Sequence, residues 1–163
     1  MTSAPLTTCL WFDTQAEEAA TYYTSIFKDA RLGNISRYGE GGPRPVGMVI
    51  TAGFELNGQP FVALNGGPEY TFTEAVSFQI PCADQAEIDY YWDRLGDDGG
   101  EPGPCGWLKD KFGVSWQVIP AALGSLLSDP DPEKAARATR AMLSMGKLDI
   151  AALQQARDGS QQK

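Results

Sequence analysis

The sequence CGWLKDKFGVSWQVIP (residues 105–120) decides the fold of the second half of the chain. It predicts a short strand at Gly106–Asp110, a turn at Phe112-Gly113 and a second strand at Val114–Ile119. Apolar residues occupy every second position of that second strand, so they share one face, whereas Ser115 and Gln117 share the other. The apolar face predicts packing against a helix. The polar face is either exposed to solvent or part of a binding site.

The order strand, helix, strands occurs twice along the chain, which predicts two copies of one structural unit. The matching tripeptides Gln15-Ala16-Glu17 and Gln85-Ala86-Glu87 lie early in the two expected helices. In the first copy we expect strands at 7–12, 32–38, 48–56 and 59–65, and a helix from Asp13 or Thr14 to Phe27. In the second copy we expect strands at 76–81, 106–110 and 114–119, a helix from Asp84 to Leu95 and a loop at 96–104. Asn57-Gly58 predicts a type I′ hairpin turn between two strands of the first copy.

After Pro120 the sequence becomes helical in character. Asp131 followed by Pro132 is a typical helix start, and Asp149 predicts a last short helix through Leu153. Asp129, Asp131 and Glu133 alternate like calcium ligands, but no glycine follows at the turn position, so we interpret them as acids at a helix start. The expected organisation is therefore module one at about 5–68, module two at about 74–120 and a helical extension at about 121–157.

Composition narrows the possible functions. The 163 residues are 42% hydrophobic and 21% charged, with a net charge of -8, which is typical of a globular protein. Binding to nucleic acid or to an anionic membrane is disfavoured, because it depends on clustered basic residues. No apolar run reaches the roughly 20 residues of a membrane span, and the N-terminus lacks a secretion signal. We expect a cytoplasmic protein.

The chain contains no histidine, which excludes Ser-His-Asp and Cys-His catalysis and histidine-ligated zinc. Its three cysteines, Cys9, Cys82 and Cys105, cannot all pair, and we expect them to be reduced thiols. Cys9 and Cys82 lie in apolar segments, so we expect both in the core.

Five stretches carry a resemblance to a known family: TTCLWFDTQAEEAATYYTSIF, LNGQPFVALNGGP, IDYYWDRL, CGWLKDKFGVSWQVIP and SDPDPEKAARATRAM. Together they cover most of the chain, which resembles the vicinal oxygen chelate (glyoxalase/bleomycin-resistance) superfamily. It is most similar to the PhnB-like branch, often labelled 3-demethylubiquinone 3-methyltransferase. The resemblance implies an α+β fold in one domain: two βαβββ modules form a curled half-barrel sheet with a ligand pocket on its concave face, and C-terminal helices follow.

The resemblance also suggests what the polar strand face does. In metal-using members the last strand carries a Glu ligand, and Gln117 stands at or near that position here. The other implied positions are Thr7 or Cys9, Ala63 or Asn65, and Ser77 or Gln79. Amides, hydroxyls and, at Cys9, a thiol replace the usual carboxylates and imidazoles, so we expect no metal cofactor. The resulting candidate ligand-binding residues, with aromatic rim candidates included, are Cys9, Trp11, Asn65, Ser77, Gln79, Trp107, Ser115 and Gln117. Phe61 is expected in the core, and the orientation of Glu55 is left open.

Three functions are compatible with this pattern. The first is metal-free binding of a small neutral or weakly polar molecule, for which paired amides are well suited. The second is an enzyme acting on a small metabolite: a metal-dependent lyase or dioxygenase, or the methyltransferase of the family label. No strand–glycine–helix element suited to S-adenosylmethionine is present. The third is a structural or interaction protein. The resemblance further implies a homodimer.

Overall fold

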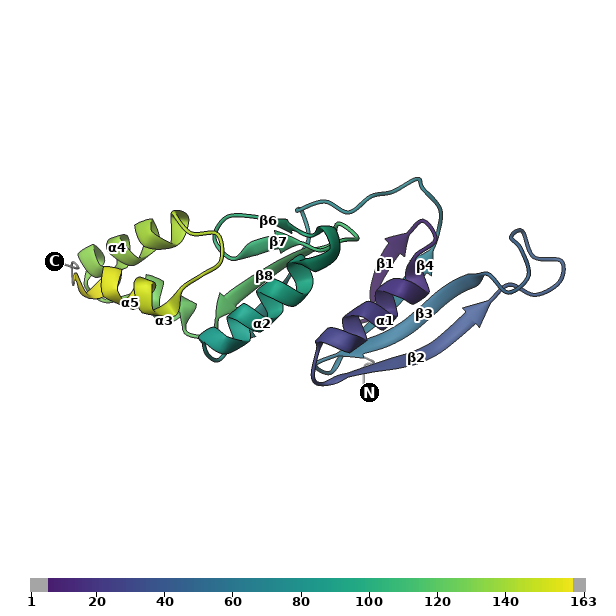
Figure 1. Ribbon diagram of the computed structural model, residues 1–163, viewed down its shortest axis with the longest axis horizontal. Helices are drawn as coiled ribbons and strands as arrows, with labels where there is room; N and C mark the ends of the chain where they lie inside the picture. The colour runs from purple at the N-terminus through teal and green to yellow at the C-terminus, as the bar shows by residue number, and fades with distance from the viewer. Residues whose placement is uncertain (1–5, 160–163) are drawn as a thin grey trace. The chain divides into compact units, whose positions relative to one another are not determined.

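The structure is a computed structural model, and it describes residues 6–159. The chain divides between Phe72 and Thr73 into two compact units, which are described separately here (Figure 1). The division falls between the two modules expected from the sequence. That both units belong to a single domain stays a prediction.

The first unit is a four-stranded sheet with one helix. Its elements are β1 (Thr8–Phe12), α1 (Ala16–Ile26), β2 (Ala30–Arg37), β3 (Val49–Leu56) and β4 (Gln59–Asn65). The strand order is β1-β4-β3-β2; β1 pairs with β4 in parallel, and the other pairs are antiparallel. The expected type I′ turn is confirmed, because Asn57 and Gly58 both have positive φ, at 49° and 79°.

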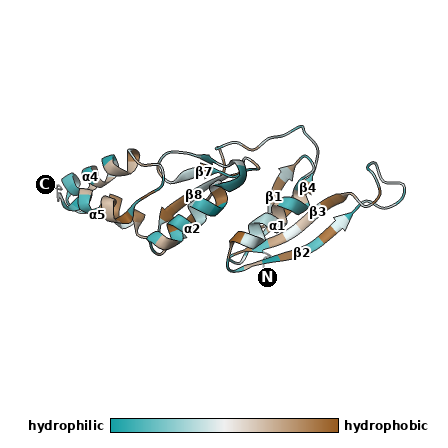
Figure 2. Cartoon of the chain, in the orientation of Figure 1, coloured by the Kyte–Doolittle hydropathy of each residue, from teal (hydrophilic) through white to brown (hydrophobic). Residues whose placement is uncertain are grey.

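Side-chain alternation explains how this sheet packs. Figure 2 shows that β2 carries both apolar residues, in brown, and polar residues, in teal. On β3 and β4 every second residue is buried, including Phe54 and Phe61, whose rings stack at 5.1 Å. Tyr23 of α1 stacks on Phe54 at 5.8 Å. One face of the sheet is therefore the core face beneath α1, and the other is open.

The start of α1 differs from the sequence expectation. Neither Asp13 nor Thr14 is the N-cap; the cap residue is Gln15, and its side chain makes no capping hydrogen bond. Instead, the backbone N–H of Ala16 donates to Oδ1 of Asn65 at 2.8 Å. An amide at the end of a distant strand thus satisfies one of the free N–H groups of the first helical turn.

Gly66 is required by the packing of Trp11. The indole N–H of Trp11 donates to the carbonyl of Gly67 at 2.9 Å. A Cβ on Gly66 would lie only 2.2 Å from the indole ring, so any larger residue would displace it. The sequence Asn65-Gly66-Gly67 therefore joins the end of β4 to both α1 and β1.

The second unit repeats the topology of the first. Its elements are β5 (Ser77–Cys82), α2 (Gln85–Gly96), the 3-10 turn η1 (Asp97–Gly99), β6 (Glu101–Pro102), β7 (Trp107–Lys109) and β8 (Ser115–Pro120). The strand order β5-β8-β7-β6 matches that of the first unit, and neither sheet closes into a barrel. The α+β fold with two similar modules is confirmed.

Two details of the second unit correct the sequence expectations. The segment 96–104, expected to be a loop, contains η1 and the short strand β6. The strand expected at 76–81 begins one residue later, because Val76 precedes β5 and is 67% exposed. The expected cap of α2 is confirmed, because Asp84 accepts a hydrogen bond from the N–H of Glu87 at 2.9 Å.

Three helices follow β8: α3 (Leu123–Leu127), α4 (Pro132–Leu143) and α5 (Ile150–Asp158). Asp131 and Asp149 cap α4 and α5 as expected, and α5 extends beyond Leu153 to Asp158. The helices enclose a small core of Leu126, Leu148 and Leu153. No helix within residues 6–159 is long and apolar enough to cross a membrane.

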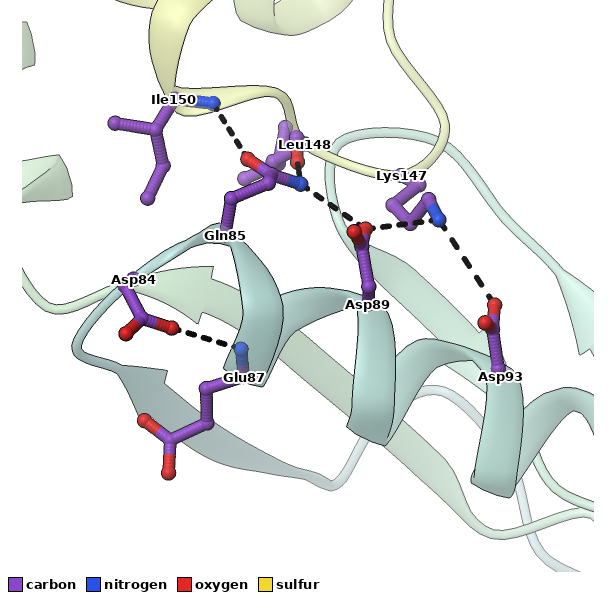
Figure 3. Close-up of polar contacts among 8 residues, drawn as sticks. All are labelled: Asp84, Gln85, Glu87, Asp89, Asp93, Lys147, Leu148 and Ile150. Carbon is purple, nitrogen blue, oxygen red and sulfur yellow. Dashed lines mark hydrogen bonds and ion pairs between the residues drawn. The ribbon is translucent and has the colours of Figure 1, made fainter.

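Gln85 joins this extension to α2 (Figure 3). Its Nε2 donates to the carbonyl of Leu148 at 3.1 Å, and its Oε1 accepts from the N–H of Ile150 at 2.9 Å. Lys147 forms an ion pair with Asp89 at 2.9 Å on the same side of α2. One amide therefore satisfies two backbone groups of the segment that leads into α5.

The cysteines are free, and their environments differ. Cys82 is buried, and desolvation, together with the nearby charges of Glu87 and Asp84, raises its pKa to about 12. It is an unreactive core thiol, as expected. Cys9 is exposed, which corrects the expectation that it lies in the core.

The turn between β7 and β8 is organised by the buried carboxylate of Asp110. Oδ1 accepts from the N–H groups of Phe112 at 2.9 Å and Val114 at 3.1 Å. Oδ2 accepts from the indole N–H of Trp116 at 2.8 Å. The turn and the first residues of β8 are thus fixed by one side chain.

Replacing Asp110 with Asn tests this role. The amide would direct its NH₂ group at one of these N–H donors, so we expect unfolding free energy to fall by about 1–3 kcal/mol. Urea unfolding at neutral pH measures the change. The matched control is Asp13→Asn, at an exposed position, with an expected change within about 0.5 kcal/mol. Equal stability of the two variants would show that the turn does not depend on the carboxylate.

Candidate functional site

Strand pairing in the second unit gathers polar side chains on one side of the sheet. Ser77 pairs with Ser115, Gln79 with Gln117, and β7 pairs with the same two residues of β8. Paired residues lie on the same face, opposite the apolar face that includes Trp116 and Val118. We call this side the polar face; it comprises Ser77, Gln79, Trp107, Lys109, Ser115 and Gln117.

Three of the expected site residues are connected by hydrogen bonds. Nε2 of Gln117 donates to Oγ of Ser77 at 2.8 Å, and Nε2 of Gln79 donates to Oε1 of Gln117 at 3.3 Å. Gln79 is exposed, whereas Ser77 and Gln117 are half-buried. Each of the two amides can form further hydrogen bonds, so both can also donate to or accept from a ligand. The structure therefore brings Ser77, Gln79 and Gln117 together.

A pocket of about 440 Å³ lies against this face. Two expected site residues, Trp107 and Ser115, line it. The remaining lining residues are Glu74, Glu101, Pro102, Gly103, Pro104, Leu108 and Lys109. The walls combine an indole and two proline rings with Ser115 and the charged residues Glu74, Glu101 and Lys109. Such a mixture of apolar surface and a few polar groups is typical of sites for small molecules.

The hydroxyl of Ser115 is the most informative polar group of the pocket. Ser115 is only 1% exposed, and its Oγ has no hydrogen-bond partner within residues 6–159. A buried hydroxyl without a partner costs about 1–3 kcal/mol. A ligand group that bonds to this hydroxyl would remove that cost.

Lys109 and Glu74 provide charges at the pocket wall. Their side chains form an ion pair. The hydrogen bond from Lys109 lowers the pKa of Glu74, and the same bond raises the pKa of Lys109. Both groups are therefore charged at neutral pH, and they compensate one another. Glu101 is exposed at the same wall.

The other three expected site residues belong to the first unit. Cys9 and Trp11 pair with Val62 and Leu64, on the open face of that sheet. The indole N–H of Trp11 is already bonded to Gly67.

Asn65 lies on the opposite, helix-covered face and is 6% exposed. Its Oδ1 accepts from Ala16, and its Nδ2 donates to the carbonyl of Val49 at 3.0 Å. Because both polar atoms of the amide are used to hold the first unit together, the site we propose does not include Asn65.

The orientation of Glu55 is now defined. It lies on the open face of the first sheet, at a groove of about 240 Å³, and forms an ion pair with Arg31 at 2.8 Å. Its carboxylate is thus compensated by a cation. No other carboxylate lines that groove within the described residues.

The donor groups do not fit a divalent cation. The polar face offers amides and hydroxyls, and the carboxylate of Glu74 is bonded to an ammonium group. Within the described part of the chain, no three Cys, Asp or Glu side chains converge as metal ligands. Cation sites normally include carboxylates, thiolates or imidazoles that offset the dehydration of the ion.

Sequence reasoning missed several pocket residues. Lys109 could have been found, because a hairpin around Phe112-Gly113 places it opposite Ser115. Glu74 precedes β5, and Pro102 and Pro104 lie in a Gly/Pro-rich segment. No periodic pattern marks such positions.

The comparisons with known proteins agree on the family. A family model described as 3-demethylubiquinone-9 3-methyltransferase matches residues 4–119. A solved PhnB protein from Bacillus cereus, described with the same methyltransferase name, is 40% identical to this chain, with a TM-score of 0.64. The alignment covers 72% of this chain and 100% of that protein. No curated protein matches the chain.

Two more distant structures support the fold alone. A protein from Pseudomonas aeruginosa is 19% identical, with a TM-score of 0.57, over 70% of this chain and 95% of its own. A FosX fosfomycin resistance protein from Mesorhizobium loti is 16% identical, with a TM-score of 0.52, over 71% of this chain and 90% of its own. From the matched family model and the similar PhnB structure, the chain belongs to the 3-demethylubiquinone-9 3-methyltransferase (PhnB-like) family.

Proposed function

We propose that this protein binds a small, neutral or weakly polar molecule at the polar face of its second unit, without a metal ion. The observation that carries the proposal is the hydroxyl of Ser115, buried and without a partner within residues 6–159, on the wall of a pocket of about 440 Å³. Folded proteins seldom leave such a group unpaired. A bound ligand that pairs with it is a simple physical reason for its presence.

The pocket walls indicate the ligand's chemistry. Trp107 and two prolines offer contact to a flat, apolar body. The hydroxyl of Ser115 can either donate to or accept from one polar group of the ligand. Because Lys109 and Glu74 neutralise each other, neither adds a free charge that would favour a strongly ionic ligand. Gln79 and Gln117 extend the hydrogen-bonding surface next to Trp107.

The enzymatic alternatives have less support. A FosX mutant from Listeria monocytogenes was solved with Mn(II) and 1S,2S-dihydroxypropylphosphonic acid; it is 17% identical to this chain, with a TM-score of 0.51. The neutral donors of the polar face do not suit such an ion. Methyl transfer would need a site for S-adenosylmethionine, and the connections β1–α1 and β5–α2 contain no glycine.

We further propose that the protein is a cytoplasmic homodimer. Each sheet has one face without a covering helix of its own unit, and large apolar side chains such as Tyr70 and Leu143 are more than 60% exposed. Both features suit a second copy of the chain. Sedimentation velocity at micromolar concentration is expected to give twice the 17.6 kDa chain mass. A monomer under these conditions would contradict this proposal.

Replacing Ser115 with Ala separates a binding role from a structural one. If the hydroxyl serves a ligand, its removal leaves no unpaired buried group, so stability of the free protein should be unchanged or higher by up to about 2 kcal/mol. The control Ser77→Ala deletes the acceptor of Gln117 and should lower stability by about 0.5–1.5 kcal/mol. Urea unfolding measures both variants.

The binding part of the experiment uses phenol, benzamide and S-adenosylmethionine as probes in thermal-shift and calorimetric titrations. We expect phenol or benzamide to stabilise the wild type and to lose that effect in Ser115→Ala. S-adenosylmethionine is expected not to bind at sub-micromolar affinity. A destabilised Ser115→Ala that still binds the aromatic probes would contradict the proposed site, and tight binding of S-adenosylmethionine would favour the methyltransferase alternative.

A further inference from the structure

The loop Gly103–Gly106 takes part in two structures at once. Gly103 and Pro104 line the pocket, together with Pro102 at the end of β6. The N–H groups of Cys105 and Gly106 donate to the carbonyls of Met145 and Gly146, each at 2.8 Å. The loop is therefore a wall of the pocket and a contact surface for the C-terminal extension.

We infer that the C-terminal extension, residues 121–159, is part of the ligand site: its docking on α2 holds the loop Gly103–Gly106 as the pocket wall. The inference rests on the proposed function, because it takes this pocket to be the binding site. It goes beyond that proposal by assigning a role to a segment that contributes no lining residue of its own.

The backbone of the loop supports this inference. Cys105 has φ of 56° and Gly106 has φ of 83°, both in the left-handed region. For a residue with a side chain, this conformation is sterically unfavourable. It persists only where surrounding contacts hold it in place. For Cys105 and Gly106 those contacts include the two hydrogen bonds to the extension.

The segment that receives these bonds is itself anchored to α2. Gln85 bonds to the carbonyl of Leu148 and to the N–H of Ile150, only a few residues after Met145 and Gly146 (Figure 3). The side chain of Leu148 is fully buried in the core of the extension. A Cβ added to Gly106 would lie 3.1 Å from Cδ1 of Leu148, so loop and anchor are in close contact. Removing the Gln85 hydrogen bonds or the Leu148 side chain should therefore make the loop Gly103–Gly106 more mobile.

The family model does not extend to the segment that gives this support. The family model ends at residue 119, and 72% of this chain is enough to cover the whole PhnB protein from Bacillus cereus. The hydrogen bonds to Met145 and Gly146 thus come from a segment that the family model does not describe. The extension is in a position to adapt the pocket wall of this chain to its own ligand.

The test measures amide hydrogen exchange in the full-length protein. Two variants loosen the anchor: Gln85→Ala removes the bonds to Leu148 and Ile150, and Leu148→Ala weakens the core of the extension. The control is Gln154→Ala, at an exposed position of α5. In both variants we expect exchange at Cys105 and Gly106 to accelerate at least about tenfold, while amides shared by β5 and β8 keep their protection. The control should not differ from the wild type.

Phenol is the probe for the pocket. Its binding is measured from the change in the NMR signal of the Trp107 indole N–H. A released loop forms the pocket wall only part of the time. We therefore expect phenol to bind at least about threefold more weakly in both variants. Unchanged exchange at Cys105 and Gly106 in both variants would overturn the inference, as would faster exchange with unchanged phenol binding. If neither phenol nor benzamide binds the wild type, the proposed function fails, and exchange alone then decides whether the extension holds the loop.

Discussion

The candidate site depends on the hydrogen bonds that the carboxylate of Asp110 accepts. It accepts hydrogen bonds from two backbone N–H groups of its own turn and from the indole of Trp116. The turn sets the register between β7 and β8, and this register decides which side chains face the pocket. A shift by one residue would exchange Ser115 and Gln117 for Trp116 and Val118. The side chain of Asp110 therefore helps to fix which residues of β8 face the pocket and which face the core.

The two units share one topology, but they use their open faces differently. In the first unit an ion pair between Arg31 and Glu55 lies at a small groove. In the second unit the corresponding face has two linked amides and a larger pocket. That pocket is lined by Ser115, whose hydroxyl has no partner within residues 6–159. The two units thus share a backbone topology. What each open face can bind depends on a few side chains that differ between the units.

Much of the fold could be predicted from the sequence, because strand alternation, the Asn57-Gly58 turn and the Asp caps are local signals. The same alternation predicts that Ser77, Gln79, Ser115 and Gln117 lie opposite the apolar strand face. The role of Asn65 could not be predicted, since its amide bonds to Ala16, 49 residues earlier in the chain. The pocket wall at Pro102 and Pro104 was also missed, because Gly/Pro-rich segments carry no periodic pattern.

Metal content tests the central claim most directly, because we propose that the pocket binds its ligand without a metal ion. The protein would be purified without chelator or metal-affinity tag, titrated with Mn(II) and followed by electron paramagnetic resonance and elemental analysis. We predict no stoichiometric site, because the polar face offers neutral amides and hydroxyls. One tightly bound ion per chain, lost on Gln117→Ala, would contradict the account.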